Sequence, residues 1–103
     1  MRFEKLGSAS DFPPGSMKRF LVRGVAVLVV HLEGAFYAIA DTCTHQEASL
    51  GEGFLDKELG VVECPLHGAR FDARTGRALS LPAVASARSF PIKLEGGCLF
   101  VAI

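Results

Sequence analysis

Two short segments of this chain each carry one cysteine and one histidine. They are Cys43-Thr44-His45 and Cys64-Pro65-Leu66-His67, and the second is followed by Gly68. The four side chains are candidate metal ligands, two offering sulfur and two offering nitrogen. Such a set suits either a tetrahedral zinc ion or a two-iron cluster whose irons have different ligands. The choice between the two decides what chemistry this chain supports.

The way the ligands are paired favours the cluster. Zinc fingers usually place two cysteines together and two histidines together, whereas each segment here mixes the two types. In a two-iron cluster, Cys43 and Cys64 would hold one iron while His45 and His67 hold the other, so each segment would span both irons. Two thiolates and two neutral imidazoles leave the oxidised site uncharged, and an uncharged site accepts an electron more readily than a dianion. A zinc-binding interaction module is the alternative.

Length and charge limit the classes of protein that fit. The chain has 103 residues, 50% of them hydrophobic and 21% charged, which predicts one globular domain spanning 1–103. Lys plus Arg and Asp plus Glu are each 11, so we expect no nucleic-acid partner. Charge is uneven locally, because the acidic side chains between residues 41 and 63 precede Arg70, Arg74 and Arg77. That cluster of arginines is either a solvated turn or a surface that recognises an acidic partner.

Nothing in the chain resembles a targeting segment. Residues 1–5 lack an apolar signal core, and the longest apolar run, 25–30, is too short to cross a bilayer. Three cysteines without a signal peptide indicate a reducing compartment rather than a disulfide framework. We therefore expect a cytoplasmic protein with no membrane association.

The pattern of apolar runs and turn residues predicts an all-β fold. The continuously apolar run 25–30 indicates a strand buried on both faces. Residues 11–15 contain consecutive prolines and form a turn, 49–59 allow one short helical turn, and Gly96-Gly97 closes a terminal hairpin. The expected strands are 19–23, 25–32, 35–40, 60–64, 89–94 and 98–102.

The turn-rich stretch 41–83 predicts a subdomain organised by the bound group. Residues 1–40 and 84–103 would then form a basal β domain. An antiparallel β-sandwich or barrel that carries a loop-rich cluster-binding subdomain is the simplest architecture.

The paired motif resembles that of Rieske iron–sulfur proteins. Supporting similarities lie at Phe12-Pro13-Pro14-Gly15, Arg70-Phe71-Asp72, Thr75-Gly76 and Leu81-Pro82, so the resemblance covers nearly the whole chain. It implies a Rieske-type fold and one [2Fe–2S] cluster per chain. The implied ligands are Cys43, His45, Cys64 and His67.

Within this family the chain is similar to the small ferredoxins of bacterial aromatic-ring-hydroxylating dioxygenases. Relatives in cytochrome bc complexes have a disulfide between the ligand loops, but the matching positions here are Ala48 and Leu66. The resemblance implies a non-catalytic electron carrier, and we expect the chain to be a monomer. Its partners would be a flavin-dependent, NAD(P)H-linked ferredoxin reductase and a terminal oxygenase. The small Rieske-like subunit of an assimilatory nitrite reductase is the alternative.

Two positions after the second ligand pair predict a low reduction potential for this class. High-potential relatives carry a serine and a tyrosine whose hydroxyls bond to sulfur, and the matching residues here are Ala69 and Phe71. Neither side chain can donate a hydrogen bond. Because such bonds favour the reduced site, we expect a value near the bottom of the Rieske range of roughly −150 to +300 mV.

The remaining candidates have simpler interpretations. We expect His31 to be an ordinary surface or half-buried residue, Cys98 a small buried hydrophobe, and Tyr37 a packing residue between sheet and cluster loops. The resemblance places the histidine ring edges at the surface. A docking rim would then surround them, formed by Gln46, Glu47, Leu66 and Pro82.

Overall fold

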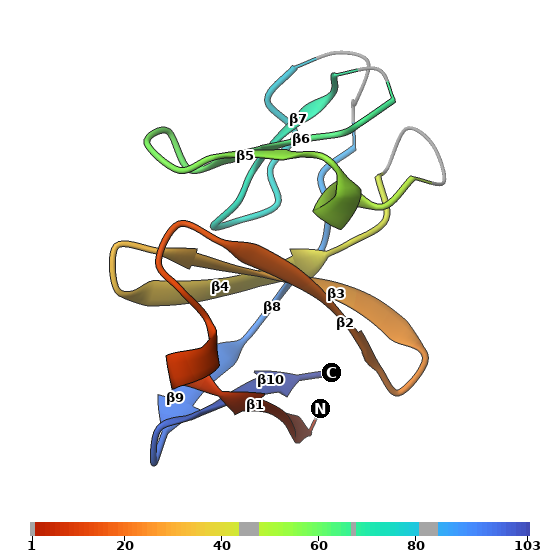
Figure 1. Cartoon of the computed structure of the whole chain (residues 1–103). Coiled ribbons are helices and arrows are strands. Elements are labelled where there is room, and N and C mark those ends of the chain that lie inside the picture. Colours follow the sequence, from red (N-terminus) through yellow and green to blue (C-terminus); the bar gives the residue numbers. More distant parts are fainter. Residues whose placement is uncertain (1, 44–47, 67, 81–84) are drawn as a thin grey trace.

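The computed structural model describes residues 2–43, 48–66, 68–80 and 85–103. Three antiparallel sheets and two short 3-10 turns make up the regular structure of these residues, and no α-helix occurs among them (Figure 1). The expected all-β fold is therefore confirmed. None of the described helical segments is long and apolar enough to span a membrane.

The three sheets follow one another along the molecule, with the middle sheet between the other two (Figure 1). The basal sheet has the order β1 (Phe3–Ser8), β10 (Cys98–Ala102), β9 (Ile92–Glu95). The middle sheet has the order β2 (Met17–Val22), β3 (Val25–Leu32), β4 (Ala35–Ala40), β8 (Ser89–Phe90). The small sheet has the order β5 (Phe54–Asp56), β6 (Val61–Glu63), β7 (Arg70–Asp72). The 3-10 turns are η1 (Ala9–Asp11) and η2 (Leu50–Glu52).

Strand β3 is buried on both faces, as its apolar run predicts. Because side chains alternate along a strand, Leu28 and Val30 point to one side and Val27 and Val29 to the other. All four are fully buried. Leu28 and Val30 belong to a core shared with the small sheet, and Val27 and Val29 to a core shared with the basal sheet. The middle sheet is thus a layer with a hydrophobic core on each side.

Two-residue turns set the register of β2, β3 and β4. Arg23 and Gly24 have φ of 51° and 81°, and Glu33 and Gly34 have φ of 49° and 82°. Paired positive φ values are typical of the type I′ turn, whose twist matches that of the flanking strands. The expected strand 19–23 was therefore misplaced at its end, since Arg23 belongs to the turn and β2 runs from Met17 to Val22.

The expected strand 89–94 is two strands in two sheets. Ser89 and Phe90 pair with β4, whereas residues from Ile92 onward pair with β10. Pro91 lies between these two strands. It has no N–H to donate to a neighbouring strand, but its carbonyl oxygen accepts a hydrogen bond from the Ala102 N–H at 2.9 Å. One short segment thus connects the middle and basal sheets. The hairpin of β9 and β10 around Gly96-Gly97 is confirmed.

His31 is more buried than expected, with 8% exposure. Its Nδ1 donates to the carbonyl oxygen of Phe12 at 2.8 Å, and its ring stacks on Phe36 with centroids 4.0 Å apart. The turn that contains the prolines folds over the end of β3, because the Gly15 N–H donates to the His31 carbonyl. Cys98 is half-buried rather than buried.

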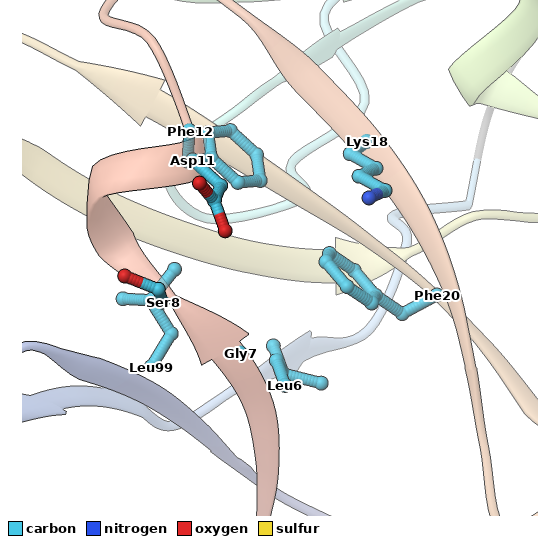
Figure 2. A pocket seen from close by; sticks show the side chains of 8 residues that line it. All are labelled: Leu6, Gly7, Ser8, Asp11, Phe12, Lys18, Phe20 and Leu99. Atoms are coloured by element: carbon cyan, nitrogen blue, oxygen red, sulfur yellow. The ribbon is translucent and has the colours of Figure 1, made fainter.

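A small pocket of about 80 Å³ lies between the basal and middle sheets. Figure 2 shows Asp11 of η1 and Lys18 of β2 on opposite sides of it, with Leu6 and Phe20 below. Three of the elements that line it, β1, η1 and β10, lie at the end of the molecule away from the small sheet (Figure 1). It has room for only a few water molecules.

The double-sided core makes a direct prediction about stability. We expect Leu28→Ala to lower the free energy of unfolding by about 2–5 kcal/mol, because it opens a cavity at a fully buried position of β3. Leu21→Ala, on the neighbouring strand at 66% exposure, is the matched control and should change it by about 0.5 kcal/mol or less. Thermal unfolding of both purified variants tests this, and equal losses would contradict the assignment.

Candidate metal centre

The two cysteines begin loops that close in the same way. The Cys43 N–H donates to the carbonyl oxygen of Ala48 at 2.8 Å, and the Cys64 N–H donates to that of Ala69 at 2.8 Å. Each bond joins a cysteine to the residue five positions later. The two loops therefore hold their cysteines at equivalent positions, although the sequence between the cysteine and histidine differs in length.

The residues that flank the two loops are also equivalent. Thr42 forms an isolated antiparallel bridge with Ser49, and Glu63 pairs with Arg70 across β6 and β7. Each pair spans its loop one position outside the closing bond. Both loops thus lie at the tip of an antiparallel pair of segments, which restricts the backbone before and after each cysteine.

Both cysteines belong to one hydrophobic core. Cys43 and Cys64 are each 3% exposed, and both lie in the core between the middle and small sheets, together with Leu50 and Phe71. The structure therefore brings together two thiols that are far apart in sequence. A dry, apolar setting of this kind suits thiolates that bind a metal group, since a bound cation offsets their charge.

Glycines allow the backbone to pack closely around the second loop. A Cβ added at Gly53 would fall on the carbonyl oxygen of Glu63, the residue before Cys64. Gly68 has a φ of 71°, which most other residues adopt only with strain. A hollow of about 320 Å³ lies beside this loop, lined among others by Phe54, Cys64 and Gly68.

A buried carboxylate holds the first loop. Asp41 is 1% exposed, and its side chain accepts hydrogen bonds from Ser49, from the Gly51 N–H and from Arg19. Sequence reasoning counted Asp41 only as one of several acidic residues and missed this role. Its position two residues before Cys43 was the available signal, but its partners come from β2 and η2 and required the tertiary structure.

The two positions that we expect to influence the reduction potential are fully buried. Ala69 and Phe71 both have 0% exposure, and the Ala69 carbonyl accepts the bond that closes the second loop. Tyr37 is partly buried against the same core, as expected, with the Arg74 guanidinium 5.7 Å from its ring centroid. Neither of the two buried side chains at positions 69 and 71 carries a hydroxyl group that could donate a hydrogen bond to sulfur.

Several predicted residues lie outside the described part of the chain. These are the candidate ligands His45 and His67, and Gln46, Glu47 and Pro82 of the expected docking rim. Of that rim, Leu66 is described and is 57% exposed. Arg70, Arg74 and Arg77 are all exposed, which leaves open both of the interpretations given to them.

Comparison with known proteins identifies the class. The model of the Rieske [2Fe–2S] domain matches residues 3–91. The ferredoxin component of biphenyl 2,3-dioxygenase from Rhodococcus jostii (strain RHA1) is 44% identical over 101 residues, covering 98% of this chain and 92% of the relative. The ferredoxin of carbazole 1,9a-dioxygenase from Nocardioides aromaticivorans IC177 matches with a TM-score of 0.94 and 35% identity, over 99% of this chain and 98% of that one.

A further match is to a chain in a complex of reduced oxygenase and oxidised ferredoxin in carbazole 1,9a-dioxygenase. It has a TM-score of 0.91 and 39% identity, and the match covers 97% of this chain and 92% of that one. The chain belongs to the Rieske [2Fe–2S] family. Within that family it is a small ferredoxin, which carries electrons and does not itself catalyse a reaction.

The structure fits the Rieske cluster that the family carries. Two buried thiols in equivalent loops, packed into one core, would supply the sulfur donors that the group needs. When bound, the cluster takes up and releases one electron at a time. Backbone bonds and the buried carboxylate restrain the segments around the two cysteines, which would limit their movement when the charge of a bound cluster changes.

The apolar positions after Cys64 generate a prediction about potential. We expect Ala69→Ser to raise the midpoint potential by on the order of 50 mV, provided that the new hydroxyl reaches a sulfur, since a hydrogen bond there favours the reduced site. Phe71→Tyr should act in the same direction. Redox titration followed by visible absorbance measures both.

Ala73→Ser is the matched control for these variants. Ala73 is also fully buried in the same core, but it lies beyond β7, and its N–H donates to the Gly60 carbonyl rather than closing a ligand loop. It should leave the potential unchanged. A wild-type value near the top of the Rieske range would refute the expectation of a low-potential site.

Proposed function

We propose that this chain carries single electrons from an NAD(P)H-dependent, flavin-containing ferredoxin reductase to the terminal oxygenase of an aromatic-ring-hydroxylating dioxygenase. Support comes from relatives that are ferredoxin components of such systems, and from the matched chain that was solved together with an oxygenase. The observation that carries the proposal is the pair of equivalent loops, which buries two thiols at one end of a domain matched over nearly its whole length.

The proposed ligands are Cys43 and Cys64 for one iron and His45 and His67 for the other. The buried, equivalently held cysteines support the sulfur half of this set. The histidine half rests on the motif, since each histidine follows its cysteine within the same loop. On this assignment, residues 41–83 would form the cluster-binding subdomain, and residues 1–40 and 84–103 the basal β domain.

The exposed apolar residues of the second loop support docking at this end. Pro65 and Leu66 are both exposed immediately after the buried Cys64. A small apolar contact of this kind suits a carrier that must bind two partners in turn and release each of them. We infer a monomer, and we place it in the cytoplasm, where NAD(P)H is available to the reductase.

Cysteine variants test the ligand assignment. We expect Cys43→Ser and Cys64→Ser each to lose the visible absorbance and the EPR signal of the reduced protein, with iron and acid-labile sulfide falling from about two each per chain toward zero. Cys98→Ser is the matched control, because Cys98 is a half-buried residue of β10 in the basal sheet. It should retain full iron and sulfide. One zinc per colourless wild-type chain would instead support the zinc-binding module.

Reconstitution tests the electron-carrier role. NADH-dependent oxygenation of an aromatic compound by a purified reductase and oxygenase should require this chain, and the Cys43→Ser variant should not replace it. The relatives favour this role over that of a nitrite reductase subunit. Stable co-purification with a nitrite reductase catalytic subunit, without any stimulation of an oxygenase, would contradict the proposal.

A further inference from the structure

The two ligand loops are alike in backbone but differ in the side chain that supports them. Asp41 lies two residues before Cys43, and the equivalent residue before Cys64 is Val62. Both side chains are buried, with 1% and 0% exposure. Val62 packs in the apolar core, so an apolar residue suffices to hold a loop of this kind. A buried carboxylate in the first loop therefore needs another explanation.

Burying a carboxylate is costly unless its charge is compensated. Three donors approach the Asp41 side chain: the Ser49 hydroxyl at 2.6 Å, the Gly51 N–H at 2.9 Å and the Arg19 Nε at 3.1 Å. Only Arg19 brings a positive charge. The carboxylate of this pair is 2% exposed and the guanidinium side chain 49% exposed, so the positive charge lies between the carboxylate and solvent.

This network acts on the segment that contains Cys43. The Asp41 carbonyl accepts from the Leu50 N–H at 2.7 Å, and its side chain holds Ser49 and Gly51. Ala48, whose carbonyl closes the loop, is the residue immediately before Ser49. Asp41 therefore connects the start of the first loop to its end. Because Asp41 lies two residues before Cys43, its ion pair with Arg19 is close in the chain to a proposed ligand.

We propose that Arg19 is a positioning and charge-compensating residue that raises the reduction potential of this ferredoxin. It does so by neutralising the buried carboxylate that braces the first ligand loop. The proposal rests on the assignment of Cys43 as a ligand. Reduction adds one electron, and thus one negative charge, to the site that Cys43 holds. An unpaired negative charge at Asp41 would oppose that addition, whereas the Arg19–Asp41 pair opposes it much less.

Replacing Arg19 by methionine tests the proposal directly. Methionine keeps an unbranched apolar side chain of similar length but removes the charge. We expect the equilibrium constant for one-electron reduction to fall by roughly three- to tenfold. This is the size of effect expected for a partly exposed unit charge that acts through the protein at an effective dielectric constant of about 20. Arg19→Lys, which keeps the charge, should restore most of the potential. The difference between Arg19→Met and wild type should shrink at high salt.

Arg23 provides a matched control on the same hairpin. Its side chain is 50% exposed and pairs with Glu4 of β1 at 3.8 Å, so its charge is directed to the basal sheet rather than to Asp41. Arg23→Met changes the net charge by the same amount and should leave the potential unchanged. Equal potentials for Arg19→Met and Arg23→Met, with full iron and sulfide in both, would overturn the proposal.

Two further measurements separate this proposal from a purely structural role and from the ligand assignment. Asp41→Asn removes the opposite charge, so the double variant Arg19→Met/Asp41→Asn should return toward the wild-type potential. If Arg19→Met alone loses the cluster, the double variant should regain full iron and sulfide, because it leaves no buried charge unpaired. Failure of the double variant to regain them would contradict the proposed role of the Arg19–Asp41 pair. A wild-type protein without iron and sulfide would instead refute the ligand assignment on which the inference rests.

Discussion

Two backbone hydrogen bonds, from Cys43 to Ala48 and from Cys64 to Ala69, are the interactions on which the site depends. Each closes a loop at the same distance from its cysteine, so two segments far apart in sequence present their thiols in the same way. Flanking antiparallel pairs hold the ends of both loops. The rest of the site serves to keep these closures in place, through apolar packing around the second loop and a buried carboxylate beside the first.

The middle sheet gives that site a firm base. Strand β3 contributes Leu28 and Val30 to the core that contains both cysteines, and Val27 and Val29 to the core beneath. A close-packed layer between two cores resists displacement, because moving it would open cavities on both sides. Cysteines that pack on such a layer would move little when the charge of a bound cluster changes. That property suits an electron carrier, for which reorganisation between the two redox states slows transfer.

Much of the fold follows from local pattern. The apolar run of β3 and the turns at Gly24 and Gly34 are strong signals, and strands 25–32, 35–40 and 98–102 were predicted with their observed bounds. Strands β5 and β7 were missed because each has only three residues, one of them an aspartate, whereas β6 is equally short but begins with two valines. Strand β1 was missed too, and Pro91 was not recognised as the point where one predicted strand passes from one sheet to another.

The sequence by itself predicted the cluster, because one thiol and one imidazole in each of two segments favour two irons over a zinc ion, and membership of the Rieske family confirms this cofactor. The absence of hydroxyls at Ala69 and Phe71 was likewise readable from the chain. Only the tertiary structure decided how the first loop is held, since Arg19, Asp41 and Ser49 come from three separate segments. Contacts of this kind depend on strand register and turn position, and no repeating pattern in the sequence predicts either of them.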